Sequence, residues 1–149
     1  MTSFPALKYL FRNALIREKG GSMKKETKLR FLRLALLAIG LFFIFGLFPT
    51  MYYFPESWGW YPRQPEYEQM IIGVYATLGV FLVLAARNPL ENRSLIWFTV
   101  WSSAVHAGIM FIQALYDNQE HANFYGDIPA LFGVAILLAT LMPRSRMFY

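Results

Sequence analysis

His106 has the most distinctive chemistry in the chain, because it is a titratable ring near the middle of a long apolar segment. Ionisable side chains at such a position are rare and often functional. Three interpretations stay open: a neutral imidazole hydrogen-bonded to a neighbouring helix, a binding or proton-handling group in a polar cavity, and a haem or metal ligand. Such metal sites usually have a second ligand, and a lone histidine supplies none, so we predict no cofactor and no metal.

Other polar side chains share the helical face of His106. At about 100° per residue they fall within one arc: Thr99, Ser102, Ser103, Met110, Gln113 and Asp117. The opposite face is apolar, and a polar stripe is costly against lipid, so we expect the arc to face other helices. We therefore take as candidate ligand-binding residues His106, Ser102, Ser103, Gln113, Gln69 and Asp127.

Small or polar residues also recur at helical spacing in the other apolar segments. They are expected to form the packed faces, because small side chains let helices approach closely in a membrane. They are Ala35, Ala38, Phe42 and Gly46 in the first segment, Gln69, Gly73, Ala76 and Thr77 in the second, and Ala130, Gly133, Leu137 and Thr140 in the fourth.

Asp127 lies in the sequence Gly-Asp-Ile-Pro, which is typical of a helix start. We expect Asp127 to be the N-cap, with Pro129 in the first turn. The alternative is a carboxylate at a cavity mouth near Gln113. Asp117, Glu120 and His121 could bind a divalent cation, although a solvated acidic loop is the simpler interpretation.

The composition indicates a membrane protein with a single domain. Of 149 residues, 56% are hydrophobic and 15% charged, against about a quarter charged in soluble domains. There is no cysteine, and no phosphate-binding loop, nucleophile elbow or zinc motif is present. We predict an all-α fold, an antiparallel four-helix transmembrane bundle, with spans at about 31–49, 68–86, 94–115 and 127–142.

The charge distribution predicts the orientation. All but one of the fourteen Lys and Arg fall in residues 1–33, the 87–93 loop or the C-terminal tail, and Arg63 is the exception. Positive charge is retained on the cytoplasmic side, so both termini are expected there. The remainder of the chain has no basic stripe for nucleic acid.

Two regions flank this pattern. Residues 1–22 form a basic extension ahead of the 23–149 domain, and they are either an amphipathic helix on the membrane surface or a segment without a role. The outer loop between the first two spans contains six aromatic residues and four prolines between 48 and 67. It is expected to lie as an interfacial belt, or alternatively as a lid over a cavity.

The hairpin between the second and third spans resembles a known family. Its segments are YATLG (75–79), LAARNP (84–89), NRSL (92–95) and WSSAVHA (101–107). They are similar to an uncharacterised family of small bacterial four-helix integral membrane proteins, a domain of unknown function, and distantly DoxX-like in outline. The resemblance implies a bacterial inner-membrane location, and it implies no activity.

These observations predict a small multi-pass membrane protein that is non-enzymatic. It would bind an apolar ligand or lipid, or act as an accessory subunit of a membrane complex. The alternative is an intramembrane enzyme or proton-coupled carrier that uses His106 in a polar cavity. The expected partners are the lipid bilayer and either a second copy or a larger membrane complex, and not nucleic acid.

Overall fold

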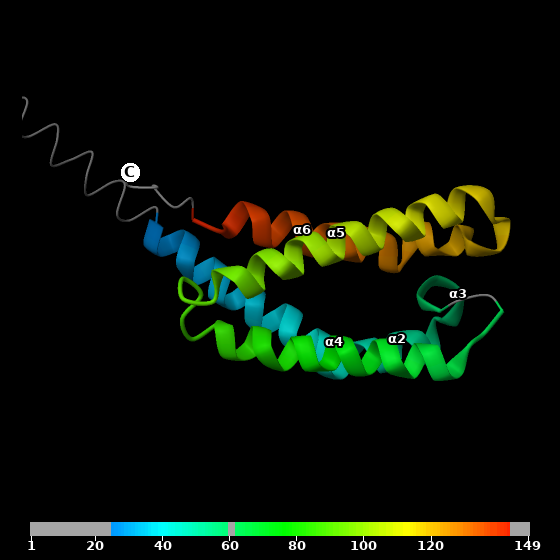
Figure 1. Ribbon diagram of the computed structural model, residues 1–149, viewed down its shortest axis with the longest axis horizontal. Helices are drawn as coiled ribbons and strands as arrows, with labels where there is room; N and C mark the ends of the chain where they lie inside the picture. Colours follow the sequence, from blue (N-terminus) through cyan, green and yellow to red (C-terminus); the bar gives the residue numbers. More distant parts are fainter. Residues whose placement is uncertain (1–24, 60–61, 144–149) are drawn as a thin grey trace, which may run out of the picture.

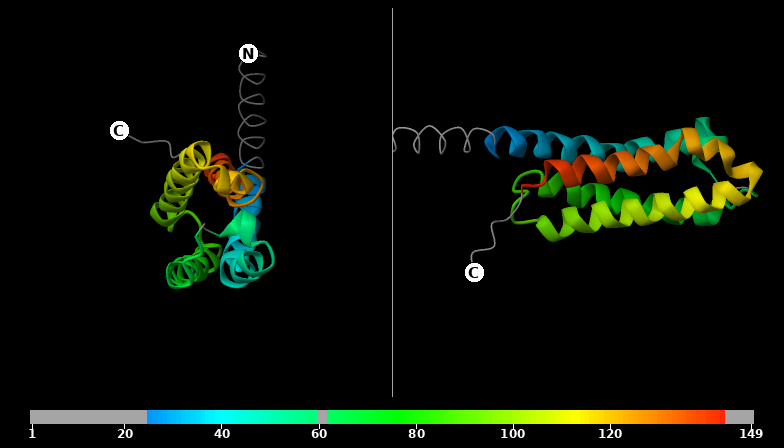
Figure 2. Two further views of the ribbon diagram at one scale, coloured as in Figure 1. Left: turned by 90° about the vertical axis from the view of Figure 1, so that its right-hand side faces the viewer. Right: turned by 90° about the horizontal axis from the view of Figure 1, so that it is seen from above.

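The computed structural model describes residues 25–59 and 62–143, and this part of the chain is helical with no strand. The predicted N-terminal extension, residues 1–22, lies outside the described residues. The long helices lie alongside one another, and consecutive ones run in opposite directions (Figures 1 and 2). Three of them are long and apolar enough to cross a membrane, and a bent pair of helices would make a fourth.

The first helix spans Lys25–Tyr53 without a break, past the expected end at Pro49. It contains a π-helical turn, η1 (Phe42–Gly46), and continues as α2 (Leu47–Tyr53). Proline lacks the N–H that an α-helix needs, but local π adjustments and hydroxyl groups can accommodate it in apolar helices. Here the Leu47 N–H donates to the Phe42 carbonyl, and Thr50 Oγ1 donates to the carbonyls of Gly46 and Leu47.

Three of the other helices follow the expected segments closely, namely α4 (Pro65–Ala85), α5 (Arg93–Tyr116) and α6 (Asp127–Leu141). A short helix that was not predicted, α3 (Pro55–Trp58), lies within the expected outer loop. The 21 residues of α4 span roughly 31 Å at about 1.5 Å each, close to the thickness of a bilayer core. Helix α6 has only 15 residues, and it is preceded at a 42° bend by the 3₁₀ segment η2 (Asn118–Tyr125).

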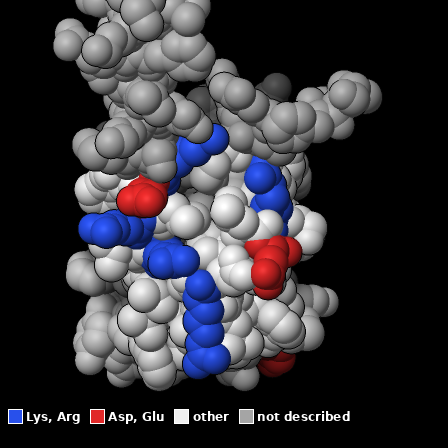
Figure 3. All heavy atoms as spheres, turned by 90° about the vertical axis from the view of Figure 1, so that its left-hand side faces the viewer, with Lys and Arg blue, Asp and Glu red and all other residues white. Residues whose placement is uncertain are grey.

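Basic residues collect at one end of the molecule, which we call the basic end (Figure 3). Here the first helix starts, α4 ends at Ala85 and α5 starts at Arg93. Arg93 also donates a hydrogen bond of 2.9 Å to the carbonyl of Pro143, which ties α5 to the end of α6. The opposite end, which holds α3, η2 and the start of α6, is called the far end.

The core has two parts. The larger cluster draws on the first helix, α4, α5 and α6 and includes Leu32, Leu36, Leu82, Ile96 and Leu138, all fully buried. The smaller cluster joins α5 to η2 and α6 towards the far end, through Ala107, Met110, Ala114, Ile128 and Leu131. The apolar face of α5 predicted to lie outside is exposed, including Trp101 at 65% and Val105 at 58%.

The packed faces of α4 and α6 differ from those expected, whereas on the first helix Ala35 is buried as expected and Ala38 is exposed. On α4 the buried residues are Glu68, Gly79, Leu82 and Ala85, whereas Gln69, Gly73 and Thr77 are exposed. On α6, Gly133, Leu137 and Thr140 are likewise exposed. The hydroxyls of Thr77 and Thr140 donate to carbonyls of their own helices, at 2.9 and 3.0 Å. They therefore need no partner on another helix.

Candidate functional site

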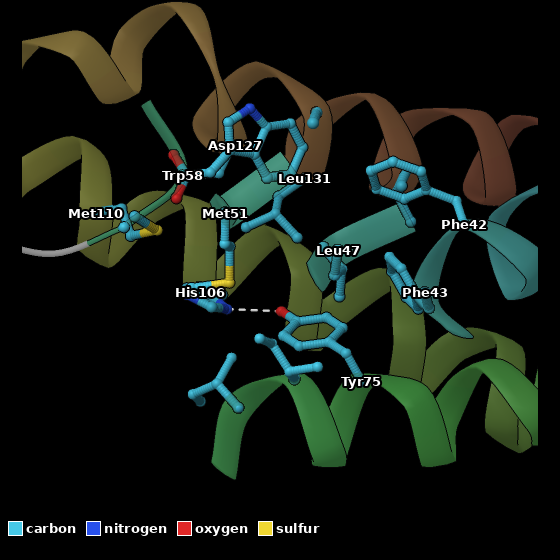
Figure 4. A pocket seen from close by; sticks show the side chains of 15 residues that line it. Phe42, Phe43, Leu47, Met51, Trp58, Tyr75, His106, Met110, Asp127 and Leu131 are labelled. Carbon is cyan, nitrogen blue, oxygen red and sulfur yellow. Dashed lines mark hydrogen bonds between the residues drawn. The ribbon is translucent and has the colours of Figure 1, made fainter. Parts of the chain in front are cut away.

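A cavity of about 70 Å³ lies between the helices in the half of the molecule nearer the far end (Figure 4). Every long helix contributes to its wall. The lining is mainly apolar, with Phe42, Phe43, Leu47, Met51, Ile71, Ile72, Met110, Ala130, Leu131 and Val134. Its polar groups are few, namely Tyr75, His106, Asp127 and the indole of Trp58. A mainly apolar lining with a few convergent polar groups is typical of small-molecule sites, although this cavity is smaller than the roughly 300–1,000 Å³ of most such sites.

His106 and Tyr75 form a hydrogen-bonded pair in this cavity. The distance between Tyr75 Oη and His106 Nδ1 is 2.6 Å, and the dashed line in Figure 4 marks it. Tyr75 lies on α4, so His106 is hydrogen-bonded to a neighbouring helix, as the first of the three interpretations requires, and the neutral state of its ring stays a prediction. The ring of Phe43 packs edge-on against Tyr75 at 4.9 Å between centroids, which holds the phenol in place.

Asp127 does not cap its helix as expected. Gly126 is the N-cap of α6, the Ala130 N–H donates to the Gly126 carbonyl, and no side chain caps this end. Gly126 takes this place because its backbone lies against α3, where an added Cβ would overlap the Ser57 carbonyl oxygen. Asp127 is therefore the first helical residue, and Pro129 lies in the first turn as predicted.

The Asp127 side chain is buried at the cavity wall. It is 8% exposed, and its Oδ1 atom has no hydrogen-bond partner among the residues that the structure describes. Leaving a buried acceptor unpaired costs on the order of 1–3 kcal/mol, so such atoms need an explanation. A capping role does not supply one here.

The structure brings together only two of the six predicted site residues, His106 and Asp127. Ser102 is half-buried and donates to the Thr99 carbonyl at 3.3 Å. Ser103 is buried, but it does not line the cavity. Gln69 and Gln113 are both exposed and lie outside the lining.

Two important lining residues, Tyr75 and Trp58, were not among the predicted site residues. Tyr75 could have been found, since it is a polar side chain within an apolar span and lies seven residues after Glu68 and before Leu82, at the spacing of one helix face. Trp58 belongs to the aromatic loop, of which Tyr52, Tyr53 and Phe54 are exposed, as expected of a belt. Trp58 is instead half-buried against Phe42, with ring centroids 5.9 Å apart.

Arg63 and Glu68 form an ion pair at the far end. Arg63 Nε and Nη2 donate to the two carboxylate oxygens of Glu68 at 2.9 and 2.7 Å. The Glu68 side chain is only 6% exposed, and that of Arg63 is 48% exposed. The single basic residue outside the predicted cytoplasmic regions is therefore neutralised by a local partner.

The acidic residues of η2 are engaged in local contacts. Asp117 accepts a hydrogen bond from the Gln119 N–H at 2.9 Å, and Asn123 donates to Glu120 at 2.6 Å. The His121 ring lies 5.9 Å from that of Phe124. Across residues 25–59 and 62–143, no three His, Asp or Glu side chains are grouped so as to hold a metal ion.

The helices and the cavity together define an all-helical protein with several apolar helices long enough to span a membrane. Comparison with protein families then identifies the family of the chain. The chain belongs to a family of unknown function, DUF6632, whose model matches residues 26–147. No curated protein and no solved structure matches the chain. The outline similarity to DoxX-type proteins therefore stays a prediction.

Proposed function

We propose that this protein is a four-helix antiparallel bundle in the bacterial inner membrane that binds a small, mainly apolar ligand or lipid without catalysis. The observation that carries this proposal is the cavity itself. Its wall is made by side chains from five helices, and only Trp58, Tyr75, His106 and Asp127 bring polar groups to it. Its volume of about 70 Å³ exceeds the roughly 10–15 Å³ needed for one water molecule.

In this proposal the bent pair η2 and α6 forms the fourth span, and the basic end faces the cytoplasm. The support is charge. Among the described residues the basic end holds Lys25, Lys28, Arg30, Arg33, Arg87 and Arg93, while the far end holds Arg63 alone. Reporters fused after Arg63 and at Tyr149 should lie on opposite sides of the membrane. Reporters on the same side would contradict the four-span arrangement.

Ligand binding is tested by filling the cavity. Val134→Phe adds a ring to the lining, whereas Ile136→Phe adds a ring to the same helix at a position that is 63% exposed. The wild type and Ile136→Phe, purified gently and examined by native mass spectrometry, should retain a lipid or small apolar molecule. Val134→Phe should lose it. An identical set of bound molecules in all three proteins, or none in the wild type, would contradict the proposal.

A second candidate function is proton handling by the His106–Tyr75 pair in an intramembrane enzyme or carrier. The observation favouring it is that Asp127 lines the same cavity, which gives His106 a second polar group nearby. His106→Gln should preserve ligand retention and bundle stability if binding is the function, because an amide can still hydrogen-bond to Tyr75. It should abolish turnover or transport if the proton is required.

A role as an accessory subunit, or as a homo-oligomer, is compatible with the same cavity. Its support is the exposed aromatic surface of α5, with Trp101 at 65% and Phe98 at 61% exposure. Cross-linking in native membranes, with a photoreactive residue at position 101, tests it.

A further inference from the structure

We propose that the ligand carries an ammonium head on an apolar body, and that the head binds Asp127. This inference rests on the proposed ligand-binding function and names the class of ligand. It starts from the one polar atom of the cavity wall that is both deeply buried and unpartnered, Oδ1 of Asp127. An unpaired acceptor at a cavity wall is a place for a donor.

Within residues 25–59 and 62–143, no Lys or Arg pairs with this carboxyl group. None of the residues that line the cavity is Lys or Arg. The guanidinium of Arg63 lies near the lining residue Gly59, but its Nε and Nη2 both donate to Glu68. The other polar pair of the cavity, Tyr75 and His106, is joined by a 2.6 Å hydrogen bond between Oη and Nδ1. The donor to Oδ1 must therefore come from water or from the ligand, and a ligand ammonium group would take the place of that water.

Asp127 lies at one part of the cavity wall, and most of the remaining lining is apolar. Asp127, Ala130, Leu131 and Val134 lie on one face of α6, at successive helical positions along the wall. From Asp127 to Val134 the helix rises by about 10 Å. Figure 4 shows Asp127 and Met110 towards one end and Phe42 and Phe43 towards the other, and the Trp58 ring lies 5.9 Å from that of Phe42. A ligand with its head at Asp127 would place its body among the apolar side chains.

Trp58 adds to this recognition of a cation. The backbone of Gly126 packs against Ser57, so the next residue in each segment, Asp127 and Trp58, is brought to the same part of the wall. Indole rings attract ammonium groups through their faces. An ammonium group would meet both a carboxyl oxygen and an aromatic ring there, whereas a hydroxyl group would gain only the hydrogen bond.

The test compares two probes of nearly the same shape, 4-fluorobenzylamine and 4-fluorobenzyl alcohol, by ¹⁹F NMR titration in phosphatidylcholine nanodiscs. The wild type should bind the amine about tenfold or more tightly than the alcohol, since hydrogen bonds to charged groups exceed neutral ones. In Asp127→Asn this preference should fall to near one. The control Asp117→Asn removes one carboxylate at the exposed end of α5 and should keep the preference.

Equal binding of amine and alcohol by the wild type would overturn the inference, whatever the folding of the variants. If both probes then lost affinity in Val134→Phe, the proposed ligand-binding function would stand without its ammonium class. Binding of neither probe to the wild type would overturn the inference, and the retained molecules seen by native mass spectrometry would decide the proposed function separately.

The ammonium can come from a free amine or from a lipid headgroup, and one further arm separates the two. Phosphatidylethanolamine has an N–H donor, and phosphatidylcholine has none. Adding phosphatidylethanolamine to the nanodiscs should weaken amine binding severalfold if a lipid headgroup is the occupant, by mass action. Unchanged affinity assigns the site to a free amine. Both results support the ammonium class, and only the amine-to-alcohol ratio overturns it.

Discussion

The middle of the molecule and the cavity region nearer the far end are packed in different ways. Near the middle, Gly40 of the first helix and Gly79 of α4 bring two backbones into contact, and the larger core cluster fills the space beside them. Nearer the far end, the large side chains of Phe42, Phe43 and Met51 line the cavity. Small residues allow the helices to pack in contact at Gly40 and Gly79, whereas large side chains surround the cavity.

The comparison predicts that stability and the proposed ligand binding depend on different residues in this chain. The glycine contact is made by backbone atoms, which cannot shift without moving a helix. The cavity wall is made of side chains, several of them only partly buried, that can rotate or move by small amounts. We therefore expect substitutions near the glycine contact to act on folding, and those at the cavity wall to act on binding.

The largest expected effect is that of Gly79→Ala. A Cβ at this position would lie 2.6 Å from the Gly40 carbonyl oxygen, so the helices must separate. Overpacking against backbone should lower the free energy of unfolding by about 3 kcal/mol. The matched control is Gly73→Ala on the same helix, where nothing lies within 4 Å of the added Cβ. It should be neutral or raise stability by up to about 1 kcal/mol. Unfolding titrations in mixed micelles measure both, and equal effects would contradict the close contact.

A smaller loss is expected from Glu68→Gln, which breaks the ion pair with Arg63. The carboxylate side is buried, but the guanidinium is half exposed and can be hydrated, so the loss should be about 2 kcal/mol rather than that of a fully buried pair. The control is Glu66→Gln. Glu66 is exposed in the same first turn of α4, so this variant should change the free energy of unfolding little. If both variants lost the same amount of stability, the loss would come from removing any negative charge in this turn and not from breaking the ion pair.

Gly126→Ala should cost about 1 kcal/mol, less than the glycine substitution in the middle of the molecule. The added Cβ would overlap the Ser57 carbonyl oxygen, but α3 is a four-residue segment that can move outward. Hydrogen exchange of residues 54–59 should increase while that of α4 stays unchanged. Protection that is unchanged in α3 would show that the two segments are not in contact.

The smallest effect is the coupling between Tyr75 and His106. Hydrogen bonds between membrane helices contribute about 0.6 kcal/mol on average, so a double-mutant cycle of Tyr75→Phe and His106→Leu should give a coupling energy of that size. His106→Gln should cost less than His106→Leu, because the amide can replace the bond. If the two single substitutions lowered stability in a strictly additive way, the hydrogen bond between Tyr75 and His106 would contribute nothing to the stability of the fold.

The sequence predicted the helical elements well, because apolar runs and flanking charges define them. The helices observed at Pro65–Ala85 and Arg93–Tyr116 lie close to the predicted 68–86 and 94–115. The packed face of α5 was also partly predicted, since Thr99, Ser103 and Met110 are buried. Gln113 was predicted on the same face but is exposed, so the buried face of α5 does not include it.

The faces of the other helices were harder to predict, and the reason is physical. Small and polar residues were expected inside, but a hydroxyl such as that of Thr77 is satisfied by its own helix and can face outward. Gly73 and Gly79 look alike in the sequence, yet only Gly79 meets another backbone. The unpaired Oδ1 atom of Asp127 was equally hard to predict, because the N-cap is Gly126, whose backbone packs against Ser57.

The π-helical turn at Phe42–Gly46 has a consequence for how the gene can vary. A π turn holds one more residue than the α turn it replaces, and a single codon lost within it would restore a regular helix. Everything beyond it would then rotate by about 100°, so that Leu47 and Met51 would leave the cavity wall. Homologues with a one-residue deletion here should therefore have a different ligand or none, while most point substitutions in the same turn should keep the register.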